Sequence, residues 1–596
     1  MAQDTIPVNK YDTSFFLANK KGWVGKLGKM IAINPNNNKK DSLPVLINNI
    51  DPYVLYKGAI IRNVELVNIG FGQSITDTSF KNKNALTRIA DELHTVTRKN
   101  AITNNLFFRK GDSLNPYLLG DNERFLRQLP YLQDAKITIR EISDDYDSID
   151  VVILYKDLFS ISGTVDASGN TLFFQAQDDN ISGYGDRLQI STLADPNRNP
   201  PFGLGVEYLK RNIEGSFVNF TIGYQSLNNA FNNGLRQETA IYSRLDLPLV
   251  TPYYLWTGAL EVGERYTQNN YVSDSLYNSD YKYNYQYYDG WAGYNISAKK
   301  QLHEFDYRKP KSFLALRLAQ TNFSDIPNIY KAQYNFKYAN LTSTLLSYTL
   351  FKQTYYHTNY IYGFGKYEDV PAGFNVSGII GWTDKNNYQR PYAGANLQRN
   401  YFSKKQNYFN FNFTAGGYFR EGRFEDFGIL FYLESFSSLK KLNKKWFHRN
   451  FINGSLAGQY NIFLNEPLRI NSSYGIASYA EIPNYNANMR ATFNYESVFY
   501  SNWKVIGFGV APFIGGTTCY LKPMGTHFFN GDLFSTISGG FRTRNEALIF
   551  GTVEFRLNYY PRTTINMSNW SFSITTDLRF QYNSVFIKRP DFVTLN

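Results

Sequence analysis

Cysteine and histidine are scarce in this sequence, and their scarcity excludes several kinds of functional site. The single cysteine, Cys519, rules out an intrachain disulfide framework and any zinc site built from cysteines. The five histidines show neither metal-ligand spacing nor pairing on a helix, and no Gly-x-Ser-x-Gly nucleophile elbow occurs. We therefore expect no cofactor, no metal and no enzymatic activity. The histidines are His94, His303, His357, His448 and His527.

Long apolar segments are also absent. No stretch of about 18 apolar residues occurs, so the sequence predicts no transmembrane helix. Yet the chain contains 48 tyrosines and 47 phenylalanines at a mean hydropathy of −0.40. A transmembrane β-barrel reconciles these values, because its rings face lipid while every second residue faces a wet lumen. On composition alone, a soluble β-sandwich or propeller with an aromatic core is the alternative.

Acidic residues are fewer than basic ones, and the net charge is +12. The Lys and Arg residues are spread along the chain, and no short run concentrates them. This distribution indicates a solvated basic surface, and it predicts no nucleic-acid partner.

From residue 159 onwards, apolar and polar residues alternate with period two. Rings on one face and polar groups on the other, over about ten residues, are typical of a lipid-facing strand, whereas strands of soluble proteins run about five or six residues. Residues 158–596 therefore predict an all-β transmembrane barrel with a short C-terminal tail. Roughly 26 residues per strand and connection gives about 16 antiparallel strands. The alternation is clearest in Phe409–Phe413, Val553–Tyr559 and Phe572–Tyr582.

Residues 51–157 predict one small α/β unit of order β-α-α-β-β, preceded by an irregular segment, residues 1–50. A helix begins with Asn115 as its cap and Pro116 at its first position, and it stops before Pro130. An earlier helix is indicated by an apolar stripe at helical spacing. The predicted strands are Ala59–Ile69, Ala135–Ile142 and Ser148–Tyr155. The stripe is Leu86, Ile89, Ala90, Leu93 and Val96, and the capped helix buries Leu118, Leu119, Phe125, Leu126 and Leu129.

This order of elements, together with the run Asn122–Ala135, resembles a POTRA domain. The POTRA domain is the periplasmic module that precedes the barrel in the BamA/TamA outer-membrane assembly superfamily. Within the run, Glu123, Arg124, Leu126 and Arg127 lie on the second helix. Taken alone, the charged residues of the run are also compatible with a solvated helix face.

A second resemblance lies near the start of the predicted barrel. Asp179–Leu188 is similar to the Asn-Leu-x-Gly-x-Gly turn between the second and third strands of BamA/TamA barrels, with Asn180, Gly183 and Gly185 at the matching positions. The glycines permit a tight turn with positive φ. The resemblance is to a short form with a single POTRA domain, and it extends from about residue 57 to the C-terminus.

In this superfamily a long surface loop folds into the lumen, where an Arg at its tip docks on an Asp of a Phe-x-Asp-x-Gly strand. In this sequence Ala477 stands in place of the Arg and Gly515 in place of the Asp. Both halves of the ion pair are missing together, which fits the cost of leaving one charge unpaired. A shifted alignment is the alternative. The expected loop tip is Gly475, Ile476, Ala477, Ser478 and Tyr479, and the expected docking strand carries Phe513 and Gly515.

The resemblance implies insertion of outer-membrane proteins, or translocation of polypeptides, through a lateral seam between the first and last strands, Leu158–Val165 and Trp570–Tyr582. The POTRA domain is expected in the periplasm, where it adds a strand of the client to its own sheet edge. One alternative is a two-partner secretion pore. Another is a non-catalytic scaffold that binds outer-membrane proteins or lipoproteins, which the missing Arg–Asp pair favours. The implied partners are outer-membrane lipids, unfolded outer-membrane or surface polypeptides and lipoprotein accessory subunits.

Overall fold

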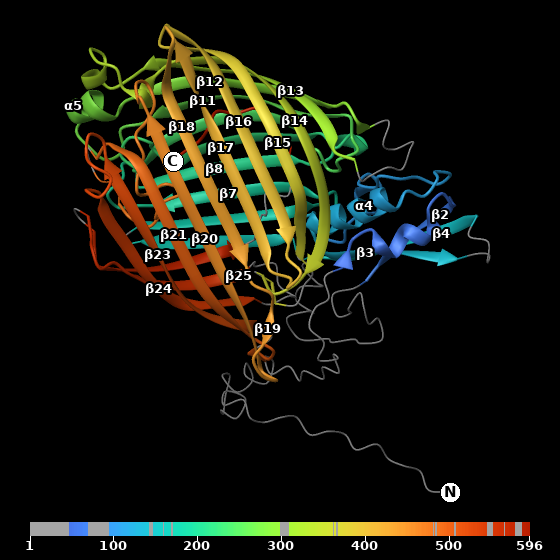
Figure 1. Cartoon of the computed structure of the whole chain (residues 1–596). Helices are drawn as coiled ribbons and strands as arrows, with labels where there is room; N and C mark the ends of the chain where they lie inside the picture. Colours follow the sequence, from blue (N-terminus) through green and yellow to red (C-terminus); the bar gives the residue numbers. More distant parts are fainter. Residues whose placement is uncertain are drawn as a thin grey trace, which may run out of the picture.

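The computed structural model shows a large β-barrel with a small α/β unit at one end (Figure 1). The predicted irregular segment 1–50 and the predicted helix Leu86–Val96 lie largely outside the described residues. The structure describes residues 47–69, 95–141, 147–158, 160–168, 171–298, 309–361, 363–364, 368–480, 482, 485–505, 508–544, 552–564, 567–578 and 587–596.

The α/β unit is a three-stranded sheet packed against helix α4. The sheet has the order β2-β4-β3, in which β2 and β4 are parallel and β3 and β4 antiparallel. Asn115 caps α4 as predicted, because its side-chain oxygen accepts a hydrogen bond from the Tyr117 N–H at 3.0 Å. Leu119 and Leu126 are fully buried in the core. The elements are η2 (Asp51–Tyr56), β2 (Ile60–Asn68), α3 (Lys99–Thr103), α4 (Pro116–Gln128), β3 (Leu132–Glu141) and β4 (Ser148–Asp157).

Twenty strands of at least eight residues form the described wall of the barrel, which closes where β26 lies beside β5. They are β5 (Ile161–Ser168), β6 (Thr171–Ile181), β7 (Asp186–Ala194), β8 (Phe202–Lys210), β9 (Asn219–Asn229), β10 (Arg236–Leu247), β11 (Trp256–Thr267), β12 (Asn284–Asn295), β13 (Lys311–Asp325), β14 (Leu341–Thr358), β15 (Glu368–Lys385), β16 (Tyr388–Phe402), β17 (Tyr408–Arg420), β18 (Arg423–Phe436), β20 (Trp446–Tyr460), β21 (Ala487–Ser501), β23 (Phe508–Pro523), β24 (Asp532–Arg544), β25 (Thr552–Tyr559) and β26 (Trp570–Leu578).

Two-residue strands and single helical turns lie at the two ends of this wall. Three two-residue strands, β1 (Ile47–Asn48), β19 (Lys440–Lys441) and β22 (Lys504–Val505), pair with long strands at the end that carries the α/β unit. Single helical turns lie in the connections: η3 (Ile213–Gly215), α5 (Asp274–Leu276), η4 (Tyr277–Tyr281), η5 (Asn328–Tyr330) and η6 (Phe336–Tyr338).

The all-β barrel and the preceding α/β unit are confirmed, but the expected number of about 16 strands is wrong. That number assumed roughly 26 residues for each strand with its connection. Between β5 and β26 each strand with its connection uses only about 21 residues. Several connections are two-residue turns, such as Asn386–Asn387 after β15 and Glu421–Gly422 after β17. Hairpins this tight consume little chain, so more strands fit into the same length.

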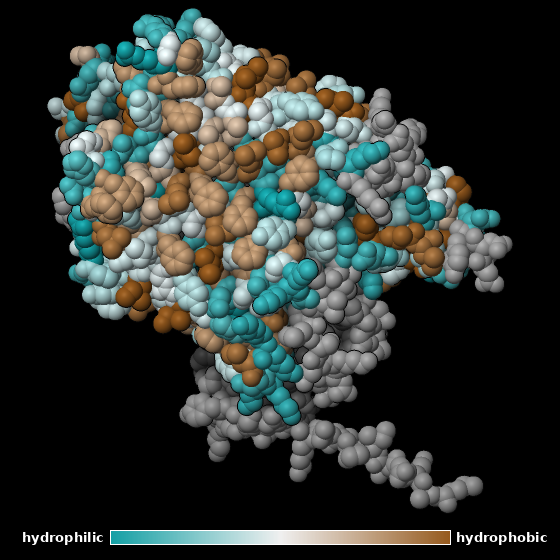
Figure 2. Space-filling model, viewed as in Figure 1, coloured by the Kyte–Doolittle hydropathy of each residue, from teal (hydrophilic) through white to brown (hydrophobic). Residues whose placement is uncertain are grey.

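The wall separates an apolar outer face from a more polar inner face, because side chains alternate along each strand. In β13, Leu314, Leu316 and Leu318 are 41%, 45% and 55% exposed, whereas Phe313 and Arg317 point inward and are buried. Figure 2 shows apolar residues gathered over the outer surface of the strands. A closed sheet with an apolar outer band satisfies its backbone groups internally, as a hydrocarbon environment requires.

The described residues contain no helix long and apolar enough to span a membrane.

Two segments occupy the lumen. The inner loop, residues 461–486 between β20 and β21, packs its Leu468 and Ile470 against wall residues of β23 and β24. The C-terminal segment, residues 587–596, follows β26 and contacts inward-facing residues of β13, β16 and β21. In Figure 1 the C-terminus accordingly lies within the outline of the barrel.

Candidate functional site

Helix α4 joins the α/β unit to the mouth of the barrel through buried ion pairs. The Arg127 guanidinium donates to the Asp369 carboxylate at the start of β15, at 2.9 Å, and also pairs with Glu123 one turn earlier on α4. The Arg127 and Asp369 side chains are only 7% and 6% exposed. His357, opposite Asp369 on β14, places its Nδ1 2.6 Å from the same carboxylate. Because these charges are desolvated, the junction depends on their pairing.

Arg124 makes a second anchor one turn away. Its guanidinium donates to the Val250 carbonyl in the connection between β10 and β11, at 3.0 Å, and lies over the Tyr355 ring of β14, 4.2 Å from its centroid. Asp121 accepts a hydrogen bond from the Thr251 hydroxyl at 2.8 Å and faces Arg124. Burial raises the pKa of the Asp121 carboxyl, an effect that the nearby Arg124 charge partly offsets.

Two other predicted helix residues hold the α/β unit itself together. Leu126 is buried in its core, and the Glu123 carboxylate accepts hydrogen bonds from the Tyr53 hydroxyl at 2.6 Å and from the Ile137 N–H at 2.8 Å. The interpretation of the charged positions as a solvated helix face is therefore wrong. Arg127 pairs with Asp369 of the barrel across 242 residues of chain, a relationship that no local pattern reveals.

The turn between β6 and β7 is the second contact between the unit and the barrel. Asn180 is fully buried; its side-chain amide donates to Thr95 O at 3.1 Å and Thr97 Oγ1 at 3.0 Å, and its oxygen accepts from the Gly185 N–H at 2.8 Å. The Arg98 N–H donates to the Gly183 carbonyl at 3.0 Å. The turn thus binds the segment that leads into α3.

The glycines of this turn allow the α/β unit to approach the barrel closely, and they also permit the geometry of the turn. Gly183 and Gly185 have φ of 78° and 81°, as predicted. A Cβ on Gly183 would also lie 2.5 Å from the Val96 carbonyl oxygen, and one on Gly185 would lie 2.5 Å from the Tyr131 ring. From the sequence, these glycines indicated only a tight turn.

The tip of the inner loop is held in the lumen by neutral contacts. Ile476 and Tyr479 are buried, whereas Ala477 and Ser478 are exposed. The Tyr479 hydroxyl lies 2.6 Å from the Arg562 carbonyl oxygen and 3.0 Å from that of Ser535, and its ring packs edge-on against Phe534 and Tyr560. The Ile476 N–H donates to the Ile470 carbonyl at 2.7 Å, and a Cβ on Gly475 would lie 2.0 Å from that carbonyl oxygen, so the turn requires glycine at this position.

The expected docking strand does not meet this tip. Phe513 and Gly515 lie on β23, but the loop packs beside Cys519 and Leu521, four to six residues further along the strand. At about 3.3 Å per residue this separation is roughly 13–20 Å. Phe513 belongs instead to a cluster at the end of the lumen near the α/β unit.

Charges do occur beside Gly515, but they come from other strands. Glu496 of β21 pairs with Arg542 of β24 at 2.6 Å and with Arg556 of β25 at 2.8 Å, and Glu554 pairs with both arginines. A Cβ on Gly515 would lie 3.2 Å from the Glu496 Cβ. The glycine therefore leaves room for this network. The sequence indicates this ion-pair network only through Glu554 and Arg556, two opposite charges that alternate on the polar face of β25.

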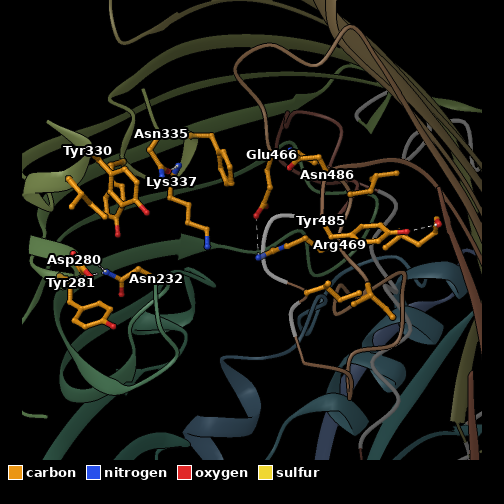
Figure 3. Close-up of a pocket in the computed structure, with 18 residues that line it drawn as sticks. Asn232, Asp280, Tyr281, Tyr330, Asn335, Lys337, Glu466, Arg469, Tyr485 and Asn486 are labelled. Atoms are coloured by element: carbon orange, nitrogen blue, oxygen red, sulfur yellow. Dashed lines mark hydrogen bonds and ion pairs between the residues drawn. The ribbon is translucent and has the colours of Figure 1, made fainter. Parts of the chain in front are cut away.

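Two cavities lined by described residues lie in the lumen. One, of about 530 Å³, lies against the polar inner wall of β6–β11 and is lined by side chains such as Gln175, Gln225 and Arg265. The other, of about 340 Å³, lies at the far end, where Lys337 faces the inner loop's Glu466 and Arg469 (Figure 3). Glu466 and Arg469 pair at 3.2 Å. Among the described residues, no group of His, Cys, Asp or Glu could hold a metal ion.

Comparison with known proteins gives distant structural likenesses only. No family model and no curated protein matches the chain. BamA from Haemophilus ducreyi lacking POTRA domains 1–3 is 10% identical with a TM-score of 0.33, covering 87% of this chain and 84% of its own. CdiB from Acinetobacter baumannii is 10% identical with a TM-score of 0.37 (90% and 94% covered). CdiB from Escherichia coli is 8% identical with a TM-score of 0.37 (92% and 92% covered). Because these likenesses are so distant, the function has to be inferred from the geometry of this chain.

Proposed function

We propose that this protein is an outer-membrane barrel that inserts or translocates other polypeptides through the seam between β5 and β26. One observation carries the proposal. Every other pair of neighbouring long strands in the described wall is consecutive along the chain, whereas β5 and β26 are separated by about 400 residues. No short connection joins the two strands at this seam, and opening it exposes two strand edges on which an incoming β-segment can pair.

The position of the α/β unit supports the same function. β4 leads into β5 after a three-residue link. The unit also binds the β6–β7 turn, because Asn180 donates to Thr95 and Thr97, and β6 is the neighbour of the seam strand β5. β2 is an edge strand of its sheet; residues 111–114 pair with its beginning at Ile60 and Ile61, so a client would pair with the later residues of β2. A client strand that pairs with β2 is thereby held near β5. The unit acts as a single POTRA domain in the periplasm, and the barrel lies in the outer membrane.

Crosslinking at two matched positions tests this proposal. Ile161 on β5 and Leu316 on β13 both face lipid and are 44% and 45% exposed. A photoreactive residue at position 161 should crosslink an unfolded outer-membrane β-barrel client during its insertion into liposomes, and one at 316 should not. Equal crosslinking at both positions, or accelerated client folding without any crosslink at 161, would contradict lateral insertion at this seam.

A non-catalytic scaffold is the second candidate, and one surface feature favours it. Phe528 and Phe529, in the connection between β23 and β24 at the far end, are 53% and 89% exposed and stack edge-to-face at 5.2 Å. Exposed apolar groups of this kind mark sites for partner proteins. A scaffold predicts a stoichiometric complex that survives purification in detergent and is lost in Phe528→Ser/Phe529→Ser, with no client crosslink at position 161.

A further inference from the structure

The C-terminal segment, residues 587–596, lies in a groove formed by the inner wall. Its contacts run in order from Arg589 and Asp591 at β12 and β13 to Leu595 and Asn596 at β21, so the segment follows the inner wall across these strands. It runs from the end that carries the α/β unit, where Ile587 packs, to the inner loop, where Asn596 is bound. The groove residues are Asp289 of β12, Arg317 of β13, Tyr392 of β16, Gly416 of β17, Gly428 of β18 and Arg490 of β21.

The charged contacts of the segment allow it to leave. Arg317 is 10% exposed and pairs with Asp289 of the wall at 2.8 Å. The segment adds Asp591, 2.7 Å from Arg317, and Arg589, 2.5 Å from Asp289, and both added side chains are nearly half exposed. When the segment departs, Arg317 and Asp289 still neutralise each other. At this pair, release of the segment therefore leaves no buried charge without a counter-ion.

The middle of the groove fits an aromatic and an aliphatic side chain. The Phe592 ring packs edge-on against Tyr392 at 5.0 Å, and the Val593 N–H donates to the Tyr392 hydroxyl at 2.9 Å. Glycines make the floor: a Cβ on Gly416 would lie 3.0 Å from Val593 Cγ2, and one on Gly428 would lie 2.7 Å from Leu595 Cδ1. The wall is thus hollowed where the segment lies.

The far end of the groove binds peptide oxygens. Arg490 is fully buried, and its guanidinium donates to the Leu595 carbonyl, to Asn596 Oδ1 at 3.1 Å and to the Arg469 carbonyl at 2.6 Å. Within the described part of the chain, all of its hydrogen-bond partners are neutral oxygens. Two of the three come from the segment, so a ligand that replaces it must supply equivalent oxygens.

We propose that this groove is a binding site for extended peptides, and that residues 587–596 are its resident ligand, which a client segment displaces. The ligand chemistry follows from the contacts: a carboxylate for Arg317, an aromatic ring for Tyr392 and an aliphatic side chain over Gly428. A tethered ligand acts at an effective concentration in the millimolar range. A free peptide therefore competes poorly with it, whereas a client held at the α/β unit is itself tethered. This role of a client rests on the function proposed above.

Peptide binding tests the groove independently of that function. The probe is a labelled synthetic peptide of residues 587–596, and the protein is the chain without these residues, in detergent, with its barrel verified by heat-modifiable migration. The peptide should bind this variant and not the full chain. Asp591→Asn or Phe592→Ala in the peptide should each weaken binding about tenfold. Equal binding of a scrambled peptide, or no binding at all, would overturn the site.

A reversible lock tests displacement in the full chain. Leu595 Cγ lies 3.4 Å from a Cβ built on Gly428, so Gly428→Cys/Leu595→Cys in a Cys519→Ala background is placed to form a disulfide. Oxidation should abolish client insertion and reduction should restore it, while Leu595→Cys alone, in the same Cys519→Ala background, should be insensitive to oxidant. A fully oxidised protein that still inserts client refutes displacement. If neither the reduced protein nor the Cys519→Ala parent inserts client, the proposed function is wrong. The peptide-binding experiment then still shows whether the groove binds extended peptides.

Discussion

Gly185 and Tyr131 are in direct contact across the junction between barrel and α/β unit, with no room for a side chain on the glycine. A Cβ on Gly185 would lie 2.5 Å from Cε1 of the Tyr131 ring. Tyr131 is itself buried, and its hydroxyl accepts a hydrogen bond from the Asn105 amide at 3.2 Å. The ring therefore cannot retreat without breaking the core of the unit.

Gly185→Ala should loosen this junction. The new methyl group meets the ring, and the φ of 81° adds strain of about 1–2 kcal/mol for a non-glycine residue. Amide hydrogen exchange should increase over residues 95–105 and 180–185, and Tyr131→Leu should restore part of the protection. Gly422→Ala is the control, because its φ is 78° and a Cβ there has no neighbour within 4 Å. Faster exchange at the junction in that control would show that the effect is not local.

Arg127 and Asp369 should show strong energetic coupling. Removing either partner leaves a buried charge without its main counter-ion, which costs about 3–5 kcal/mol. In a double-mutant cycle of Arg127→Met and Asp369→Asn, read from hydrogen exchange over α4, the double variant should be far less destabilised than the sum of the single variants. Arg140–Glu65, an ion pair whose side chains are 58% and 42% exposed, is the control and should couple by less than about 1 kcal/mol. Similar coupling in both pairs would mean that Arg127 is solvated.

The limits of the sequence-based predictions follow from the range of the interactions. Strand alternation, the Asn115 cap and the burial of Leu126 are local patterns, and all three are present in the structure. The partners of Arg127 and Asn180 are not local: contacts across 242 and 85 residues depend on how two separately folded units dock. The predicted number of strands was wrong because the connections vary between a two-residue turn and the 26-residue inner loop. The alternation of apolar and polar residues does not reveal the length of a connection.

The C-terminal segment was missed for a related reason. Residues 587–596 follow the last strand, and they were predicted only as a short tail. Their binding groove is assembled from six strands, each contributing a single residue or pair, such as Arg317 or Gly428. Single inward-facing residues spread over 200 positions form no motif. Only the closed wall brings them together.

Leu126→Asp should unfold the α/β unit and leave the barrel intact. A carboxylate buried in the core of the unit costs several kcal/mol, which is comparable to the whole stability of a small domain. Trypsin should then remove residues 51–157 quickly, while the remaining barrel keeps its heat-modifiable migration. Leu55→Asp is the matched control, because Leu55 belongs to the same unit and is 67% exposed. A Leu126→Asp protein as protease-resistant as this control would show that the α4 core face is wrongly assigned.

Gly515→Asp should destabilise the barrel, and Ala477→Arg should fail to rescue it. The new carboxylate lies beside Glu496 and competes with it for Arg542 and Arg556, and its Cβ crowds the Tyr495 carbonyl. The Tyr479 hydroxyl at the loop tip binds the Ser535 carbonyl, three residues (about 10 Å) along β24 from Ser538, the partner of Gly515. We therefore expect no ion pair between an arginine at position 477 and the new carboxylate.

A double-mutant cycle on the urea or heat midpoint of the barrel measures this directly. The two changes should be additive within about 0.5 kcal/mol, as expected for sites without shared partners. Gly515→Asn separates crowding from charge, because it introduces a side chain of the same shape without a carboxylate. It should cost less than Gly515→Asp, since it does not compete for the arginines. A coupling above about 1 kcal/mol between positions 477 and 515 would mean that the loop tip docks on Gly515 after all, and that the packing of Tyr479 against Phe534 is not its resting place.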